Sequence, residues 1–303
     1  MACFRPITAY KLEHGGVTFN RNERGVLCDV QLPCGKCTGC LKARAQGWAV
    51  RCMHEASMHD LNCMVTLTYE KHLEPVNGLD HSHFQAFFKR LRQMLRRSDH
   101  QVRLSNPSHP YTRIKFFMSG EYRPGLQGPH YHAIIFGMDF LDKKWFKDNE
   151  RGDPIYISRK LQDLWGHGFC SIVDVTLDSC AYVARYCLDK VHGQLADFHY
   201  MGLTPEYSRM SLRPAIGKEW LEKYHRVTYR DDAVVMDGRR YKPPRYYDKL
   251  AKSVCADRLE VVKEDRELFA LRPEQKWNAT PDRLAVREEV ALQKLKLRER
   301  DLS

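Results

Sequence analysis

Two short motifs carry the side chains of this 303-residue chain that are best suited to chemistry. His130 and His132 lie two positions apart in a predicted strand, and because strand side chains alternate, both imidazoles point to one face. Tyr182 and Tyr186 lie four positions apart in a predicted helix, which also gives them a common face. The chemistry that these groups could do together is metal-assisted attack of a phenol on a phosphodiester.

A third ligand for the metal is available in the strand before the histidines. Residues 113–122 and 130–137 are predicted strands, and the turn-forming residues between them predict a hairpin that can bring Glu121 opposite the imidazoles. Two imidazoles and a carboxylate suit Mn²⁺ or Mg²⁺, with positions left open for phosphate oxygens and water. The alternative is that the histidines bind nothing, because such pairs are common by chance. The apolar strand, where an unpaired imidazole is costly, and Glu121 favour the metal.

The predicted tyrosine helix separates apolar from polar positions. Its core face is expected to hold Cys180, Val183, Ala184, Cys187 and Leu188. Tyr182, Tyr186 and Lys190 form an i, i+4, i+8 row on the other face. Helical tyrosines usually serve packing, but these lie away from the apolar stripe. We therefore expect exposed nucleophiles, with Lys190 orienting a phosphate or favouring the ionised phenol, and a helix cap at Asp178 or Ser179.

The elements that must position these groups predict an α+β fold. Strands are expected at residues 63–69 and 168–175, beside the hairpin, and helices at residues 79–97 and 158–165, the second capped by Ser158. Together with the tyrosine helix, this order fits an antiparallel sheet backed by helices, close to the split βαβ arrangement.

We expect three regions along the chain. Residues 1–60 form a Cys-rich segment, irregular up to residue 37, followed by a helix. Residues 61–236 form the domain that carries the histidines and tyrosines. Residues 237–303 form a basic, aromatic linker and a charged helical tail.

The balance of charge favours a polyanionic partner. The chain holds 49 Lys and Arg against 38 acidic residues, a formal charge of +11, which is suited to nucleic acid. Basic residues of helix 79–97, and others beyond the tyrosine helix, are candidates for holding a DNA backbone. They are Lys89, Arg90, Arg92, Arg96, Arg97, Arg209, Arg213 and Lys218. The alternative for these residues is a solvated charged face.

Other classes of protein are not expected. The chain has no apolar run of about 18 residues that could span a membrane, and its start lacks the apolar core of a signal peptide. Eleven cysteines without a secretion signal indicate reduced thiols. The motif of a P-loop is absent, so a nucleotide-driven motor is not expected. We predict an intracellular protein without a membrane partner.

A cluster of cysteines precedes the first predicted helix. Cys34, Cys37 and Cys40 have the spacing of ligands for a structural Zn²⁺. A fourth ligand could come from Cys28, Cys52, His54 or Cys63. The alternatives are small buried thiols without a metal and, less favoured, an iron–sulfur cluster.

Three motifs resemble those of the HUH endonucleases, the rolling-circle replication initiators. Residues 128–137 resemble the metal motif of that family, residues 182–190 its two-tyrosine motif, and residues 64–69 its first strand motif. Glu121 stands where related initiators place a third metal ligand.

Further segments narrow the resemblance to the replication initiators of gokushovirus-like microviruses, which are small single-stranded DNA phages. The cysteine cluster together with residues 48–55 is similar to these proteins, and so are residues 210–217. Ala215 departs from the common form, which has glycine there. The resemblance covers residues 30–225 and leaves the tail without a counterpart.

The resemblance implies a mechanism. The metal held by Glu121, His130 and His132 would polarise the scissile phosphate of single-stranded origin DNA, and Tyr182 or Tyr186 would attack it. This gives a 5′-phosphotyrosine link and a free 3′-hydroxyl that primes synthesis. The second tyrosine could then cut the regenerated origin. A host helicase and DNA polymerase would be partners, and the site of action would be the cytoplasm of a bacterial host.

Two other interpretations remain open. A plasmid relaxase or a transposase would use the same chemistry, although the close second tyrosine and the cysteine cluster favour a phage initiator. The chain could also be a zinc-stabilised DNA-binding protein without catalysis, its histidines and tyrosines being merely structural.

Overall fold

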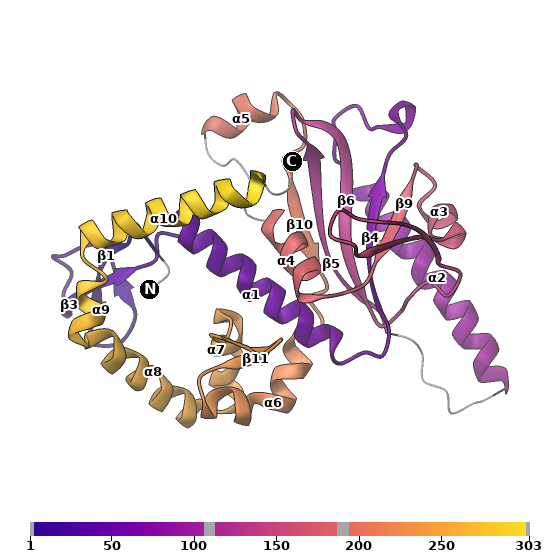
Figure 1. The fold of residues 1–303 in the computed structure, drawn as a ribbon. Helices are drawn as coiled ribbons and strands as arrows, with labels where there is room; N and C mark the ends of the chain where they lie inside the picture. Colours follow the sequence, from indigo (N-terminus) through magenta and orange to yellow (C-terminus); the bar gives the residue numbers. More distant parts are fainter. Residues whose placement is uncertain (1–2, 106–112, 187–193, 301–303) are drawn as a thin grey trace. The chain divides into compact units, whose positions relative to one another are not determined.

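The computed structural model describes residues 3–105, 113–186 and 194–300 (Figure 1). These residues fall into two compact units, one formed by residues 1–44 with 256–303 and the other by residues 45–255. Each unit is described by itself. The described residues contain no helix long and apolar enough to cross a membrane.

The unit of residues 45–255 is built on a seven-stranded sheet in which every neighbouring pair is antiparallel. Across the sheet the strands are β10 (Tyr207–Met210), β5 (Lys115–Arg123), β6 (Gln127–Phe136), β4 (Asn62–Thr68), β9 (Cys170–Val173), β8 (Pro154–Ile157) and β7 (Lys144–Asp148). The expected hairpin is β5–β6, and the α+β class with an antiparallel sheet backed by helices is confirmed.

One face of the sheet, which we call the α2 face, is covered by α2 (His81–Ser105) and α3 (Arg159–Trp165). Leu67 of β4, Phe87 of α2 and Trp165 of α3 are all fully buried there. Because strand side chains alternate, the residues between those of the α2 face point to the opposite side. Burial on both faces explains why β4 and β6 are nearly continuous apolar runs.

The opposite face, the α4 face, is covered by α4 (Leu177–Tyr186) and by α1 (Thr38–Ala56), a helix that begins in the first unit. Met64 of β4 and Ile134 of β6 pack there against Val183 of α4 and Cys52 of α1. In Figure 1, α2 and α4 lie on opposite sides of the sheet. The histidines of β6 share the α4 face with Ile134, because they alternate with it along the strand.

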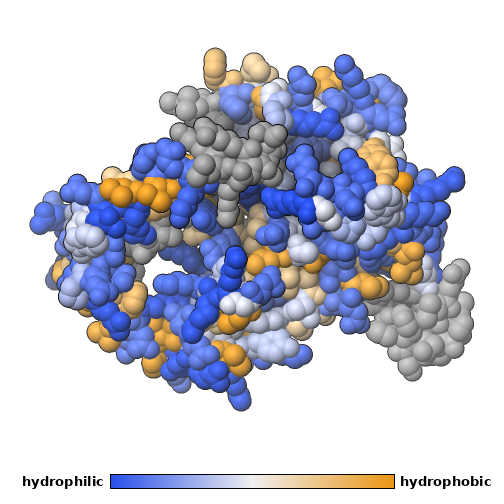
Figure 2. Space-filling view, viewed as in Figure 1, coloured by the Kyte–Doolittle hydropathy of each residue, from blue (hydrophilic) through white to orange (hydrophobic). Residues whose placement is uncertain are grey.

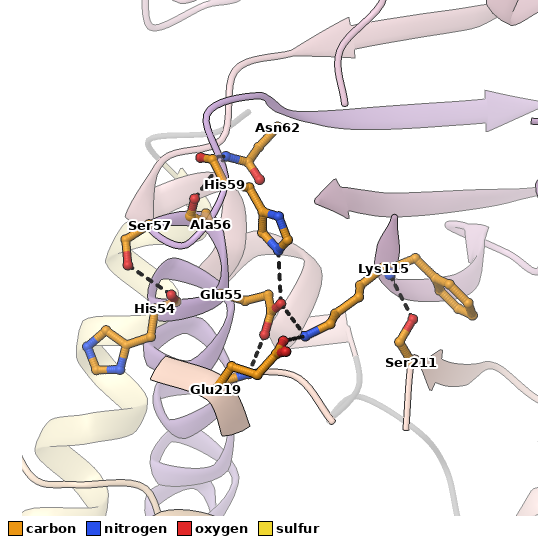
Figure 3. Close-up of polar contacts among 11 residues, drawn as sticks. His54, Glu55, Ala56, Ser57, His59, Asn62, Lys115, Ser211 and Glu219 are labelled. Atoms are coloured by element: carbon orange, nitrogen blue, oxygen red, sulfur yellow. Dashed lines mark hydrogen bonds and ion pairs between the residues drawn. The ribbon is translucent and has the colours of Figure 1, made fainter. Parts of the chain in front are cut away.

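A buried polar network fastens β5 between α1 and α6 (Lys218–Arg230) (Figure 3). Lys115, the first residue of β5, forms ion pairs with Glu55 at 2.7 Å and with Glu219. Glu55 is 1% exposed and also accepts hydrogen bonds from His59, at 3.0 Å, and from the Gly217 amide, at 2.7 Å. The network sets the position of the strand that carries Glu121.

The remainder of this unit contains one short 3₁₀ helix, two further helices and a hairpin. They are η1 (Lys71–Leu73), α5 (Gln194–Tyr200), α7 (Arg245–Val254) and the hairpin β11 (Val234–Met236)–β12 (Arg239–Tyr241). Tyr247 of α7 is fully buried, and its hydroxyl lies 2.9 Å from Nδ1 of His54, which stacks on Trp220. The segment expected as a basic linker thus forms β12 and the start of α7. The boundaries at residues 60 and 237 stay predictions.

The other unit contains a three-stranded antiparallel sheet and three helices. The strands, in the order β2-β1-β3, are β2 (Val17–Thr18), β1 (Ile7–Leu12) and β3 (Val26–Leu32), and the helices are α8 (Ala256–Leu271), α9 (Pro273–Trp277) and α10 (Pro281–Arg300). An ion pair at 3.0 Å joins Arg5 to Glu288 of α10. The prediction that residues up to 37 are irregular was wrong, because these strands are held by pairing across the sheet and leave most side chains exposed, without an apolar alternation.

Two further details correct the sequence analysis. The tyrosine helix begins at Leu177 and is capped by Thr176 rather than by Asp178 or Ser179. The Ser179 amide donates to Oγ1 of Thr176 and the Thr176 amide donates to Oγ of Ser179, which is a reciprocal capping pattern. The hairpin β7–β8 was missed, because its residues are exposed or half-buried and carry no apolar periodicity. Ser158 caps α3 as expected, accepting from the Leu161 amide.

Candidate active site

Glu121, His130 and His132 lie together on the α4 face. Glu121 of β5 is directly opposite His130 of β6 in the register of the hairpin. Nε2 of His130 lies 4.0 Å from Oε2 of Glu121, and Nε2 of His132 lies 3.8 Å from Oε1. The three ligand atoms are all within 4.8 Å of one another. Since two metal–ligand bonds of about 2.1 Å span at most about 4.2 Å, a divalent ion fits between the carboxylate and each imidazole.

Hydrogen bonds at the other ring nitrogens aim both imidazoles at Glu121. Nδ1 of His130 donates to the carbonyl oxygen of Gly128 at 3.0 Å, so its Nε2 presents a lone pair. Nδ1 of His132 lies 3.0 Å from Oγ1 of Thr66, its register partner on β4. Such outer contacts orient metal-binding histidines.

Burial keeps the two imidazoles neutral. His132 is 6% exposed, and its removal from water, with a smaller effect of His130, lowers its pKa to about 3. The pKa of His130 is also lowered by burial, although its bond to Gly128 opposes the change. Neutral imidazole is the form that binds a metal. The donor set and its protonation therefore fit the Mn²⁺ or Mg²⁺ expected from the sequence.

Tyr182 of α4 reaches the histidines. Its ring meets the ring of His132 edge to face, with centroids 5.1 Å apart and planes at 86°. The core side of α4 is buried through Cys180, Val183 and Ala184, whereas Tyr182 is 37% exposed. The separation of faces predicted for this helix is confirmed for these residues.

The other residues of the expected tyrosine row are less fully described. Tyr186 is the last residue of α4, and Lys190, like Cys187 and Leu188, lies outside the described residues. Arg185 was not singled out from the sequence. Its guanidinium carbon lies 5.8 Å from the centroid of the Tyr182 ring, so a cation stands beside the phenol.

The expected DNA-contacting residues do not gather at this centre. On α2, Lys89, Arg96 and Arg97 are exposed, and the helix covers the face of the sheet opposite the histidines. Arg90 instead donates to the carbonyl oxygens of Leu164 and Trp165, at 2.8 and 3.1 Å.

The candidates beyond α4 are dispersed. Arg209 lies beside Tyr207, whose ring packs on the α2 face, and Lys218 pairs with Glu222 at 3.0 Å. Arg213 lines a cavity of about 630 Å³ together with Arg92 and Arg96. Arg113, which the sequence analysis passed over, lines it too.

This cavity and the histidines lie at opposite ends of β5. The cavity contains Lys115, six positions before Glu121, a separation of about 20 Å along a strand. Hydrophilic residues predominate on the surface drawn in Figure 2, with apolar residues in scattered patches. The basic residues are thus spread over the surface instead of forming one patch at the candidate active site.

Four cysteines form a second group that could hold a metal. Cys3, Cys34, Cys37 and Cys40 have sulfur atoms within 4.8 Å of one another. Burial would raise the pKa of Cys37, but hydrogen bonds from the amides of Phe4 and Cys40 and from neighbouring thiols hold it at about 6. Thiolate is the form that binds zinc.

Cys3 is the fourth member that the sequence analysis missed. Pairing of Ile7 with Leu32 in the β1–β3 ladder places the start of the chain beside Cys34, a contact that no local spacing could indicate. The fourth ligands expected from the sequence lie elsewhere. Cys28 is exposed on β3, Cys52 and Cys63 are in the apolar clusters of the large sheet, and His54 stacks on Trp220.

Comparison with known proteins identifies the family. A family model described as replication-associated protein, of the ORF2 type, matches residues 62–191, the part that holds the histidines and tyrosines. No solved structure matches the chain.

Three curated relatives extend the match beyond these residues. The chain is 35% identical to the replication-associated protein VP4 of Bdellovibrio phage phiMH2K, over 82% of this chain and 76% of the relative. It is 30% identical to the replication-associated protein ORF2 of Spiroplasma virus 4, over 90% and 88%. With the replication-associated protein ORF4 of Chlamydia phage 1 the identity is 31%, over 75% and 55%. The chain therefore belongs to the family of phage replication-associated proteins.

Proposed function

We propose that this protein is a metal-dependent tyrosine endonuclease and strand transferase that initiates rolling-circle replication on single-stranded origin DNA. The observation that carries the proposal is the edge-to-face contact of Tyr182 with His132, which places a phenol beside the Glu121–His130–His132 group. Membership of a family of replication-associated proteins supports it.

In this proposal Glu121, His130 and His132 hold Mg²⁺ or Mn²⁺. When bound, the ion supplies Lewis acidity to the scissile phosphate. The phenolic oxygen of Tyr182 or Tyr186 forms a bond to phosphorus as the bond to the 3′ oxygen breaks, and the phenolic proton is transferred, directly or through solvent, to the released 3′ oxygen. One ester replaces another, so rejoining needs no nucleotide.

The two tyrosines divide the reaction between them. After one attacks, a 5′-phosphotyrosine holds the strand while the 3′-hydroxyl primes synthesis. The second then cleaves the regenerated origin, and the displaced strand is rejoined. Lys190 would orient the phosphate. Strand separation and synthesis fall to a host helicase and DNA polymerase, in the cytoplasm of the bacterial host.

The experiment that tests this activity is formation of a covalent adduct. The purified protein is incubated with Mn²⁺ and end-labelled single-stranded oligonucleotides that tile the genome encoding it, and labelled protein is sought after denaturation. We expect an adduct with one oligonucleotide and none after both Tyr182→Phe and Tyr186→Phe are introduced. Tyr224→Phe is a matched control, because Tyr224 is also 37% exposed. Persistence of the adduct in the double variant would contradict the proposal.

The same experiment separates the alternatives. A non-catalytic DNA-binding protein would bind the oligonucleotides and form no adduct with any of them. A relaxase or transposase would form an adduct but leave no need for the second tyrosine in a circularisation assay.

We also propose that Cys3, Cys34, Cys37 and Cys40 hold a structural Zn²⁺. In a tetrahedral site with Zn–S bonds of about 2.3 Å, sulfur atoms lie about 3.8 Å apart. The distances from Cys3 to Cys34 and Cys37 are 3.6 and 3.8 Å. Backbone amides donate to these sulfurs as well, from Cys34 to Cys3 and from Cys37 to Cys34, each at 3.3 Å. These bonds stabilise thiolates.

Elemental analysis of the purified protein tests the zinc site. We expect close to one zinc per chain, and no iron. Cys3→Ser should lower the zinc content substantially, whereas Cys28→Ser, a change at an exposed cysteine outside the group, should leave it unchanged. Full zinc content in Cys3→Ser would remove Cys3 from the site.

A further inference from the structure

Beyond the metal group, the α4 face continues along one row of the sheet. His130 of β6 pairs with Thr68 of β4, and Thr68 in turn bonds Phe169, the residue before β9. The Thr68 amide and hydroxyl both donate to the Phe169 carbonyl, at 3.0 and 2.7 Å. Phe169 alternates with Cys170, which is buried on the α2 face, so its ring points to the α4 face. It stands two strand spacings, about 10 Å, from His130.

A second exposed ring extends this row. Phe146 of β7 lies at a bulge between Trp145 and Lys147, and its ring centroid is 5.7 Å from that of Phe169, with an angle of 51° between the planes. Each of the two rings is 44% exposed. Two adjacent exposed phenylalanines gain little from folding compared with burial in a core, and their position beside the candidate active site therefore indicates a binding role.

The charge around the two rings suits a polyanion. Nζ of Lys147 lies 5.9 Å from the centroid of the Phe146 ring, and Lys144 is exposed on the same strand. The acid of this strand, Asp148, accepts a hydrogen bond from the indole of Trp145 at 3.0 Å. Aromatic rings next to lysines are the combination that binds single strands, because bases stack on the rings while cations contact the phosphates.

We propose that Phe146 and Phe169 form a stacking platform for bases of the single-stranded DNA next to the scissile phosphate. The platform rests on the proposed function, since that function brings a single strand to the metal group on the same face. Its occupant is the segment of DNA that crosses β4 and β9, with Lys144 and Lys147 contacting the backbone.

Binding and cleavage assays on matched variants test the platform. In EDTA, which excludes cleavage, we measure by fluorescence anisotropy the affinity for a labelled single-stranded oligonucleotide. Phe146→Ala combined with Phe169→Ala should weaken binding at least about tenfold. The double change to Tyr keeps both rings and should bind within about twofold of the unchanged protein. Trp145→Ala is the control, because Trp145 pairs with Tyr156, whose ring packs on the α2 face.

The outcomes separate the platform from the chemistry. If the double alanine variant binds as tightly as the unchanged protein, or if Trp145→Ala weakens binding equally, the platform is overturned, whatever the adduct assay shows. If binding falls with alanine and is kept with tyrosine, the platform stands, even where no adduct forms and the proposed chemistry fails. Loss of binding to a protein instead of to DNA would likewise overturn it.

Discussion

The ring of Tyr182 stands edge-on against the ring of His132, 5.1 Å between centroids, and thereby joins α4 to the central hairpin of the sheet. Neither motif alone specifies this contact. It arises because Cys180, Val183 and Ala184 bury one side of α4 against the same sheet face that carries the histidines. The opposite side of the helix is left to present a phenol at the metal group.

The hydroxyl of Thr66 is expected to act as a positioning group for His132. Thr66→Val removes the partner 3.0 Å from Nδ1 and frees the imidazole to rotate. Loss of such a contact lowers metal affinity or activity about 10- to 100-fold. Titration with Mn²⁺, followed by electron paramagnetic resonance, measures the affinity.

Thr68→Val is the matched control for this change. Thr68 lies on the same strand and face, but its hydroxyl donates to the Phe169 carbonyl. Its variant should keep the Mn²⁺ affinity of the unchanged protein. Equal losses in both variants would show that the strand, rather than the bond to His132, was affected.

Lys115 is expected to be a major contributor to stability. Lys115→Met leaves Glu55, which is 1% exposed, without its closest cation. Breaking a buried pair in this way costs about 3–5 kcal/mol, and the loss should appear as a lower midpoint of urea unfolding. The comparison is Lys218→Met, which breaks the exposed pair with Glu222 and should cost at most about 1 kcal/mol. Similar losses in the two variants would contradict a special role of the buried network.

Stability should fall as the solution is acidified, partly through His54. Burial lowers the pKa of His54 to about 3, from an ordinary value of 6.5. Between these values the unfolded chain binds a proton that the folded protein does not, so the free energy of unfolding rises with pH up to about 6.5 and falls below it. The slope from this one group approaches about 1.4 kcal/mol per pH unit.

A variant isolates this contribution from those of the other buried groups. His54→Gln removes the titrating group and should flatten the pH dependence of unfolding between about pH 4 and 6. His225→Gln, on the solvent side of α6, should leave the slope unchanged. An unaltered slope in His54→Gln would mean that the imidazole is not held neutral.

The sequence predicted what local pattern can carry. Alternation in β6 and the turn before it placed His130, His132 and Glu121 on one hairpin, and helical spacing separated Tyr182 from the core side of α4. These features depend on residues close together in the chain.

What the sequence did not predict depends on distant pairing. Cys3 joins the cysteine group only because β1 pairs with β3, and Phe146 meets Phe169 only because β7 and β8 extend the sheet. Thr66 reaches His132 through the register of two strands that are far apart in the chain. Burial and exposure patterns of single segments hold no record of such contacts.

Mass spectrometry of the protein–DNA adduct tests the central claim most directly. After reaction with Mn²⁺ and single-stranded origin DNA, nuclease and protease digestion should yield a peptide with a nucleotide attached through a 5′ phosphate to Tyr182 or Tyr186. Attachment to any residue outside α4, or a cleaved strand without any attached peptide, would contradict the account.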